Sequence, residues 1–179
     1  MTNIARLYGG SLFDLGLEEG VLDELHEQTR QVREIFRENP DYTRLLSEPS
    51  ISLEKRCEMI DEALGDGAQK YLVNFLKLLC ERGYLGEYAG CCDQFMDRYR
   101  EDRGIAVARV TSAVPLGEAQ LSALCDKLEK MSNKTVEMKT IIDPSVMGGI
   151  RVELDGKLLD GTVKGRLDGI SRKLEEVSV

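Results

Sequence analysis

The chain has 179 residues, and its 24 basic and 32 acidic side chains give a formal net charge of −8. This length suits one ordinary domain or two small ones, and the 42% apolar and 31% charged residues are typical of a globular protein. The negative charge argues against nonspecific nucleic-acid binding, which requires Lys and Arg to neutralise phosphates. A single histidine, His26, excludes a His-rich metal site and disfavours catalysis by a histidine acid–base pair.

Targeting and redox signals are also absent from the sequence. The chain start has no basic region followed by a continuous apolar run, so we expect no signal peptide. The most apolar stretch, residues 71–80, contains Asn74 and Lys77 and is too short to span a bilayer. The five cysteines show no C-x-x-C spacing, so we expect buried thiols in a reducing compartment. A redox pair formed by the neighbours Cys91 and Cys92 is the alternative.

Apolar residues at helical spacing predict six helices in the first hundred or so residues. Thr2 and Ser52 are candidate N-caps, and Gly65, Gly83 and Gly104 are candidate helix stops. The fifth helix is apolar on more than one face, so we expect it to be surrounded on several sides. The predicted helices cover residues 3–15, 17–39, 41–47, 53–64, 71–82 and 87–103.

After Gly104 the spacing of apolar residues predicts strands as well as helices. The predicted elements are a strand over 105–114, a helix over 118–131, strands over 136–142 and 150–154, a returning strand at 158–159 and a helix over 163–177. Asp155-Gly156 is a two-residue hairpin signal. Gly148-Gly149 predicts a tight turn with positive φ rather than a phosphate-binding loop, because neither a lysine nor a helix follows it.

The net charge also changes at Gly104, where the spacing of apolar residues changes. Residues 1–104 hold 13 basic and 21 acidic side chains, whereas residues 105–179 hold 11 of each. The whole net charge of −8 therefore belongs to the first part. We predict a mainly α protein, with a six-helix bundle domain over residues 1–104 followed by a small α+β domain over residues 105–179.

No catalytic constellation is evident. The sequence has no phosphate-binding P-loop, no dinucleotide-binding glycine motif after a strand and no nucleophile elbow. Carboxylates such as Glu34, three residues before Arg37, occur at the spacing of surface ion pairs, and His26 falls on a polar helix face where we expect it to be solvent-exposed. The sequence therefore offers no candidate catalytic, cofactor-binding or metal-binding residues. Apolar surface beside a terminal helix, where Phe13 adjoins Leu12, favours a binding groove for an amphipathic helix.

Four segments resemble one family. Residues 141–154 read IIDPSVMGGIRVEL and are similar to the signature of the delta subunit of bacterial ATP synthases, whose mitochondrial relative is the oligomycin-sensitivity-conferring protein. Residues 159–167 resemble the closing motif of that family, and residues 51–56 resemble the start of its mid-domain helix. Residues 5–13 resemble its opening helix, although Gly9-Gly10 stands where the family usually has better helix formers. Each such glycine weakens an isolated helix by about 1 kcal/mol relative to alanine.

The resemblance implies a non-catalytic stator subunit of a proton-translocating ATP synthase, bound peripherally at the cytoplasmic face of the bacterial inner membrane. It implies that the helical domain binds the N-terminal helix of alpha subunits, and that the C-terminal domain binds the ends of the b subunits in the peripheral stalk. The subunit would bind no nucleotide and no nucleic acid, and would not insert into the membrane. Two other functions remain open, a free-standing helical adaptor for amphipathic peptides and a thiol-dependent redox protein.

In this family the groove for the alpha-subunit helix lies between the first and fifth helices. The candidate partner-binding residues on those helices are Tyr8, Leu12, Phe13, Leu72, Phe75, Leu76 and Leu79. The sequence leaves open which of them face the groove and which face the core.

Overall fold

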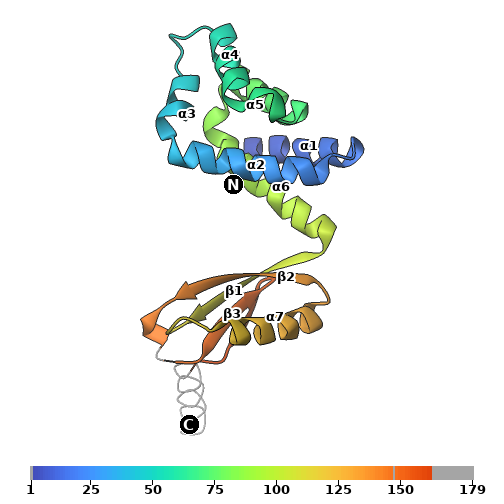
Figure 1. The fold of residues 1–179 in the computed structure, drawn as a ribbon, viewed down its shortest axis with the longest axis vertical. Coiled ribbons are helices and arrows are strands. Elements are labelled where there is room, and N and C mark those ends of the chain that lie inside the picture. The colour runs from blue at the N-terminus through green and yellow to red at the C-terminus, as the bar shows by residue number, and fades with distance from the viewer. Residues whose placement is uncertain (1, 147, 163–179) are drawn as a thin grey trace, which may run out of the picture. The chain divides into compact units, whose positions relative to one another are not determined.

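The computed structural model describes residues 2–146 and 148–162, and it is mainly helical with a small four-stranded sheet (Figure 1). The chain divides into two compact units, Met1–Arg100 and Glu101–Val179, called here the helical unit and the α+β unit. The division falls in the last turn of a helix, a few residues before Gly104. The helix predicted over 163–177 lies outside the described residues.

Six α-helices lie near the predicted positions. They are α1 (Asn3–Glu18), α2 (Leu22–Glu38), α3 (Pro40–Leu46), α4 (Leu53–Leu64), α5 (Lys70–Glu81) and α6 (Tyr88–Arg103), with short 3-10 helices η1 (Gly65–Gly67) and η2 (Leu85–Glu87). The predicted break at Gly16 is wrong: α1 continues through Gly16, which packs closely against Leu22 and Leu25, and the chain turns at residues 19–21.

The N-caps are confirmed, because the Thr2 hydroxyl accepts a hydrogen bond from the Ala5 N–H at 3.1 Å and the Ser52 hydroxyl accepts one from the Lys55 N–H at 3.4 Å. Gly65, Gly83 and Gly104 follow α4, α5 and α6 with φ of 62°, 71° and 62°, a conformation that glycine adopts without steric cost.

One apolar cluster forms the core of the helical unit. All six helices contribute to it, but α3 and α4 supply only one fully buried side chain each, Leu46 and Ile60. The core is therefore carried mainly by α1, α2, α5 and α6. Helix α5 contacts α1, α2, α4 and η2, as its apolar residues on more than one face predict.

The α+β unit contains a mixed sheet in the order β2-β1-β3-β4. Its elements are β1 (Ile105–Ser112), α7 (Glu118–Ser132), β2 (Thr135–Ile142), η3 (Pro144–Val146), β3 (Ile150–Leu154) and β4 (Lys157–Asp160). Strand β1 pairs parallel with β2, and such a pair needs a crossover connection, which α7 provides. The β1–β3 and β3–β4 pairs are antiparallel.

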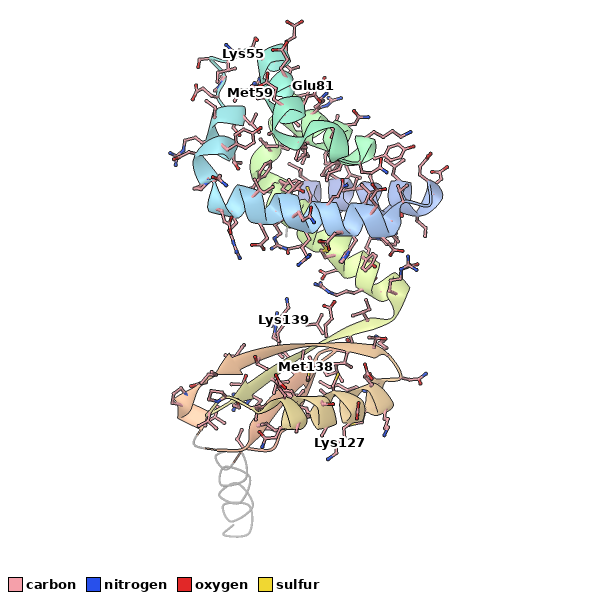
Figure 2. All side chains as sticks on the ribbon, in the orientation of Figure 1. Lys55, Met59, Glu81, Lys127, Met138 and Lys139 are labelled. Carbon is pink, nitrogen blue, oxygen red and sulfur yellow. The ribbon has the colours of Figure 1, made fainter. Side chains whose placement is uncertain are left out.

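Helix α7 covers one face of this sheet. Leu128 of α7 is buried among Ala106, Val110 and Val152 of the strands, in a cluster that shares no residue with the core of the helical unit. The period of two along a strand sends successive side chains to opposite faces. Figure 2 shows this for two residues of β2: Met138 lies on the α7 side of the sheet, and Lys139 points to the opposite side.

Both predicted glycine turns are confirmed. Asp155 and Gly156 have φ of 47° and 75°, so the β3–β4 hairpin uses a turn with two left-handed residues. Gly149 has φ of 80°, and a Cβ placed on it would lie 2.4 Å from the carbonyl oxygen of Gly161. Gly149 is thus required by a close approach of two backbone segments.

The prediction that His26 is solvent-exposed is wrong. The imidazole is partly buried and stacks on the ring of Tyr99, with 3.9 Å between ring centroids and 13° between ring planes. The Tyr99 hydroxyl in turn donates a hydrogen bond to the Asp23 carboxylate at 2.8 Å. His26 lies on the polar side of α2, but an aromatic ring from α6 covers it, which spacing within α2 alone does not reveal.

Within residues 2–146 and 148–162, none of the helices has the length and apolar content that a membrane span requires.

Candidate partner-binding groove

A largely apolar groove of about 280 Å³ lies between α1 and α5. Its walls come from one stripe of each helix, at the i, i+3, i+4, i+7 spacing that places side chains on one face. The lining residues are Tyr8, Ser11, Leu12 and Leu15 of α1 and Tyr71, Asn74, Phe75 and Leu78 of α5. The Leu78 side chain is 38% exposed, so a binding partner can contact it.

Glycine residues place α1 in direct backbone contact with α6. A Cβ on Gly9 would lie 2.3 Å from the carbonyl oxygen of Cys91, and a Cβ on Gly90 would lie 2.9 Å from the Cβ of Ala5. The two helices can approach this closely only because these positions carry no side chain. Gly9, expected with Gly10 to weaken α1, thus allows the close packing of this helix on α6, and α1 is continuous over Asn3–Glu18.

Polar contacts of Tyr71 join the ends of the two groove helices. Its hydroxyl donates a hydrogen bond to the carboxylate of Glu19, the residue that follows α1. The ammonium group of Lys70 lies 4.6 Å from the centroid of the Tyr71 ring, within cation–π distance. The hydrogen bond to Glu19 holds the start of α5 against the end of α1, while the contact with Lys70 lies within α5.

The structure brings three of the seven predicted partner-binding residues together in this groove, Tyr8, Leu12 and Phe75. The other four lie only in the core and are at most 4% exposed: Phe13, Leu72, Leu76 and Leu79. Leu12 and Phe75 line the groove but also belong to this core, at 3% and 8% exposure, so most of their surface is already covered.

Phe13 shows why neighbours in sequence separate. One residue along a helix is a rotation of about 100°, so Leu12 faces α5 while Phe13 faces α6. There the Phe13 ring makes an edge contact with Phe95 at 6.2 Å, and the Arg98 guanidinium lies over it at 4.6 Å. Arg98 also donates a hydrogen bond to the Gly10 carbonyl at 3.0 Å and pairs with Asp14 at 2.9 Å.

Sequence reasoning missed five lining residues, Ser11, Leu15, Tyr71, Asn74 and Leu78. A signal for those on α5 is present in the sequence. Tyr71, Asn74 and Leu78 form a stripe next to the fully apolar Leu72, Leu76 and Leu79, and of two adjacent stripes the one that contains a polar residue is more often the outer one.

The two adjacent thiols do not have the environment of a reactive pair. Cys91 and Cys92 are free and each 1% exposed, and burial raises the pKa of Cys91 to about 11 and that of Cys92 to about 12. Because the thiolate is the reactive form, thiols with raised pKa are poor nucleophiles at neutral pH. Their environment is that of small core side chains, as expected, and Cys80 is buried too. The expectation is wrong for Cys57 and Cys125, which are only partly buried. Among the described residues, no three His, Cys, Asp or Glu side chains are grouped so as to hold a metal ion.

Comparisons with known proteins agree on one family. The family described as ATP synthase delta (OSCP) subunit matches residues 4–174. ATP synthase subunit delta of Geobacillus sp. (strain WCH70) is 36% identical over 172 residues, and that of Anoxybacillus flavithermus is 33% identical, each alignment covering 96% of both chains.

A solved structure shows the same fold. A chain of the Toxoplasma gondii mitochondrial ATP synthase hexamer superposes with a TM-score of 0.76 at 18% identity, over 97% of this chain and 98% of that chain. The resemblance seen in residues 141–154 and 159–167 is thus matched along nearly the whole length of the protein. The chain belongs to the ATP synthase delta (OSCP) subunit family.

Proposed function

We propose that this chain is the non-catalytic stator subunit that joins the catalytic head of an ATP synthase to its peripheral stalk. Residues 1–104 bind the N-terminal helix of an alpha subunit, and residues 105–179 bind the ends of the b subunits. The two attachments prevent the head from turning with the central rotor. The complex lies at the cytoplasmic face of the bacterial inner membrane, with this subunit attached peripherally.

The α1–α5 groove is the observation that carries this proposal. An amphipathic helix binds by burying apolar anchors in a groove between two helices, and most of the affinity comes from the apolar area removed from water. The groove has apolar walls formed by Leu12, Leu15 and Phe75, and its outer edge is the half-exposed Leu78. It therefore fits one turn or two of a partner helix with apolar side chains at i, i+3 and i+4.

The charge of the helical half indicates the kind of helix that binds. Residues 1–104 carry a net charge of −8. A partner with basic residues beside its apolar stripe would be attracted to this half and oriented by it. A neutral apolar helix would gain no such attraction, so the association rate with a basic helix should fall as salt is added.

The test is calorimetric titration of the full-length protein with a peptide of the alpha-subunit N-terminus. Replacing Leu78 by Asp places a charge on the groove wall, where the peptide would desolvate it. The peptide affinity should fall by at least about tenfold, equivalent to ~1.4 kcal/mol. Leu53→Asp is the matched control, because Leu53 is also 38% exposed but lies on α4, outside the groove lining.

Binding of the peptide to the wild type, its loss in Leu78→Asp and its retention in Leu53→Asp are expected. Equal affinity for all three proteins would contradict the groove assignment. The attachment of residues 105–179 is tested with the same variant, which should still bind a peptide from the distal end of the b chain with unchanged affinity.

A further inference from the structure

The end of α2 meets α3 at one corner of the helical unit (Figure 1). A second cavity lies at this corner, lined by residues of α2, α3 and the junction of η2 with α6. Its volume is about 460 Å³, larger than that of the α1–α5 groove. The proposed stator function makes no use of it. Three arginines line this corner cavity, Arg33, Arg37 and Arg44, and no carboxylate is among its lining residues.

The cavity lining is basic although the part of the chain that contains it is acidic, since residues 1–104 carry a net charge of −8. Each arginine has a carboxylate partner outside the lining: Arg33 pairs with Asp93 at 2.6 Å, Arg37 with Glu34, and Arg44 with Asp41 at 3.3 Å.

These ion pairs leave the arginines able to bind a further anion. A guanidinium has five N–H donors, so one carboxylate partner does not saturate it. The side chains of Arg37 and Arg44 are 71% and 81% exposed, and ion pairs in such positions contribute little free energy. Both guanidinium groups can therefore turn toward a bound anion at small cost.

The floor of the corner cavity is apolar and rigid. Leu85 and Tyr88 are each 2% exposed, and the Phe36 and Tyr88 rings lie 5.1 Å apart between centroids. The Tyr88 hydroxyl is directed away to the Thr29 carbonyl, to which it donates a hydrogen bond at 3.3 Å. An apolar body placed over these side chains would meet no unsatisfied polar group from Tyr88.

We infer that the corner cavity binds an amphiphilic organic anion, a carboxylate with a medium-length alkyl or aryl body. The anionic group is held by the guanidinium groups of Arg37 and Arg44, and the apolar body lies on Phe36, Leu85 and Tyr88. One exposed ion pair contributes little, but two guanidinium groups can donate to both oxygens of one carboxylate, and such multiple charge-assisted contacts are stronger than a single one. The cavity volume is in the range of small-molecule sites, about 300–1,000 Å³.

The shape favours a small molecule over a partner helix. A helix needs an extended groove between two elements, as α1 and α5 provide. The corner cavity is instead bounded by three elements, α2, α3 and the η2–α6 junction, rather than by two helices side by side. A helical peptide that displaces the small anion from this cavity would contradict this choice.

The first arm of the test compares three probes with the same apolar body, decanoate, decanol and decylammonium, by calorimetric titration of the full-length protein. Decanoate should bind at one site per chain. Decanol should bind at least about tenfold more weakly because it lacks the charge, and decylammonium should show no binding. Equal affinities for the three probes would show that apolar contact alone accounts for binding and would overturn the proposal.

The second arm blocks the cavity. Gly86 lines it, and a Cβ built on Gly86 meets no heavy atom within 4 Å, so the backbone position accepts a side chain and Gly86→Leu adds bulk to the cavity wall. The control is Gly67→Leu, because Gly67 has equally open surroundings and does not line the cavity. Decanoate binding should be lost in Gly86→Leu and retained in Gly67→Leu, and equal effects of the two substitutions would overturn the assignment.

The third arm removes the charge without filling the space. The double variant Arg37→Gln/Arg44→Gln should bind decanoate at least about tenfold more weakly and should no longer prefer it to decanol. This variant decides the question if Gly86→Leu fails to fold, which its circular dichroism melt reports. Unchanged preference for decanoate in the double variant would exclude the arginines as the anion site. Binding of the alpha-subunit peptide at the α1–α5 groove should be the same in all these variants.

Discussion

At the scale of single residues, Cys91 and Cys92 show how burial determines the chemistry of a side chain. Adjacent cysteines in a sequence permit a redox pair, but here each thiol is 1% exposed and packs in the main core. Burial disfavours the charged thiolate, so the pKa is raised to about 11 for Cys91 and about 12 for Cys92, from an ordinary value of 9.0. The nearby Glu87 adds to the effect on Cys91.

These shifts predict how stability depends on pH. The folded protein retains both thiol protons at pH values where the unfolded chain releases them. The stabilisation is therefore complete below about pH 9 and is lost as the pH rises toward 11 for Cys91 and 12 for Cys92. We expect the urea midpoint to fall between pH 9 and 11 more steeply in the wild type than in Cys91→Ala/Cys92→Ala. Other groups that titrate in this range are the same in both proteins, so equal slopes would refute the prediction.

At the scale of elements, the packing of α1 on α6 depends on which glycine faces α6. Gly9 and Gly10 are adjacent and both buried, yet a Cβ on Gly9 would collide with the Cys91 backbone at 2.3 Å, whereas one on Gly10 would lie 3.4 Å from the mobile end of Arg98. The backbone of α6 cannot move away without displacing the helix, but an arginine tip can.

Alanine substitutions should therefore have opposite effects at the two positions. Gly9→Ala is expected to destabilise the protein by about 2–3 kcal/mol, as overpacking of a core does. Gly10→Ala is expected to be neutral or stabilising by up to about 1 kcal/mol, because alanine is the better helix former. Urea denaturation monitored by circular dichroism measures both, and a Gly9→Ala variant at least as stable as the wild type would show that α1 and α6 are not in close contact at this position.

Helix α5 has two apolar stripes, one packed in the core and one that lines the groove. The stripe of Leu72, Leu76 and Leu79 is at most 1% exposed and holds α5 in the core. The adjacent stripe of Tyr71, Asn74 and Leu78 lines the groove. A helix that is apolar on one side only could not serve as both core and binding wall, which explains why α5 is apolar on more than one face.

At the scale of the whole molecule, the two units have separate cores and different charge. The apolar cluster of the helical unit shares no residue with that of the α+β unit. Residues 1–104 carry the net charge of −8, while residues 105–179 are neutral. This division suits a protein that, as proposed, holds two different partners at its two ends.

Separate cores predict that the two units can be destabilised one at a time. Leu79→Ala removes a fully buried side chain of the helical unit, and Val110→Ala removes one of the α+β unit. The leucine substitution should cost about 2–5 kcal/mol and the valine substitution somewhat less. Hydrogen exchange of the full-length protein should show lost protection over 3–98 in the first variant and over 105–160 in the second. Loss of protection across both units in either variant would show that they unfold together.

The sequence by itself determined where the elements lie and to which family the chain belongs. Apolar spacing, the caps at Thr2 and Ser52 and the Asp155-Gly156 turn are local signals, because each depends on residues within a few positions of one another. The motif over residues 141–154 is local in the same sense, and the family match over residues 4–174 agrees with it.

Only the tertiary structure decided which side chains form the groove. Spacing along a helix gives the angle of a side chain about the helix axis, but not what lies at that angle. Phe13 is taken into the core by Phe95 and Arg98, His26 is covered by Tyr99, and Gly9 is required by the backbone at Cys91. Each of these neighbours comes from α6, more than sixty residues further along the chain, so no pattern within α1 or α2 could have revealed it.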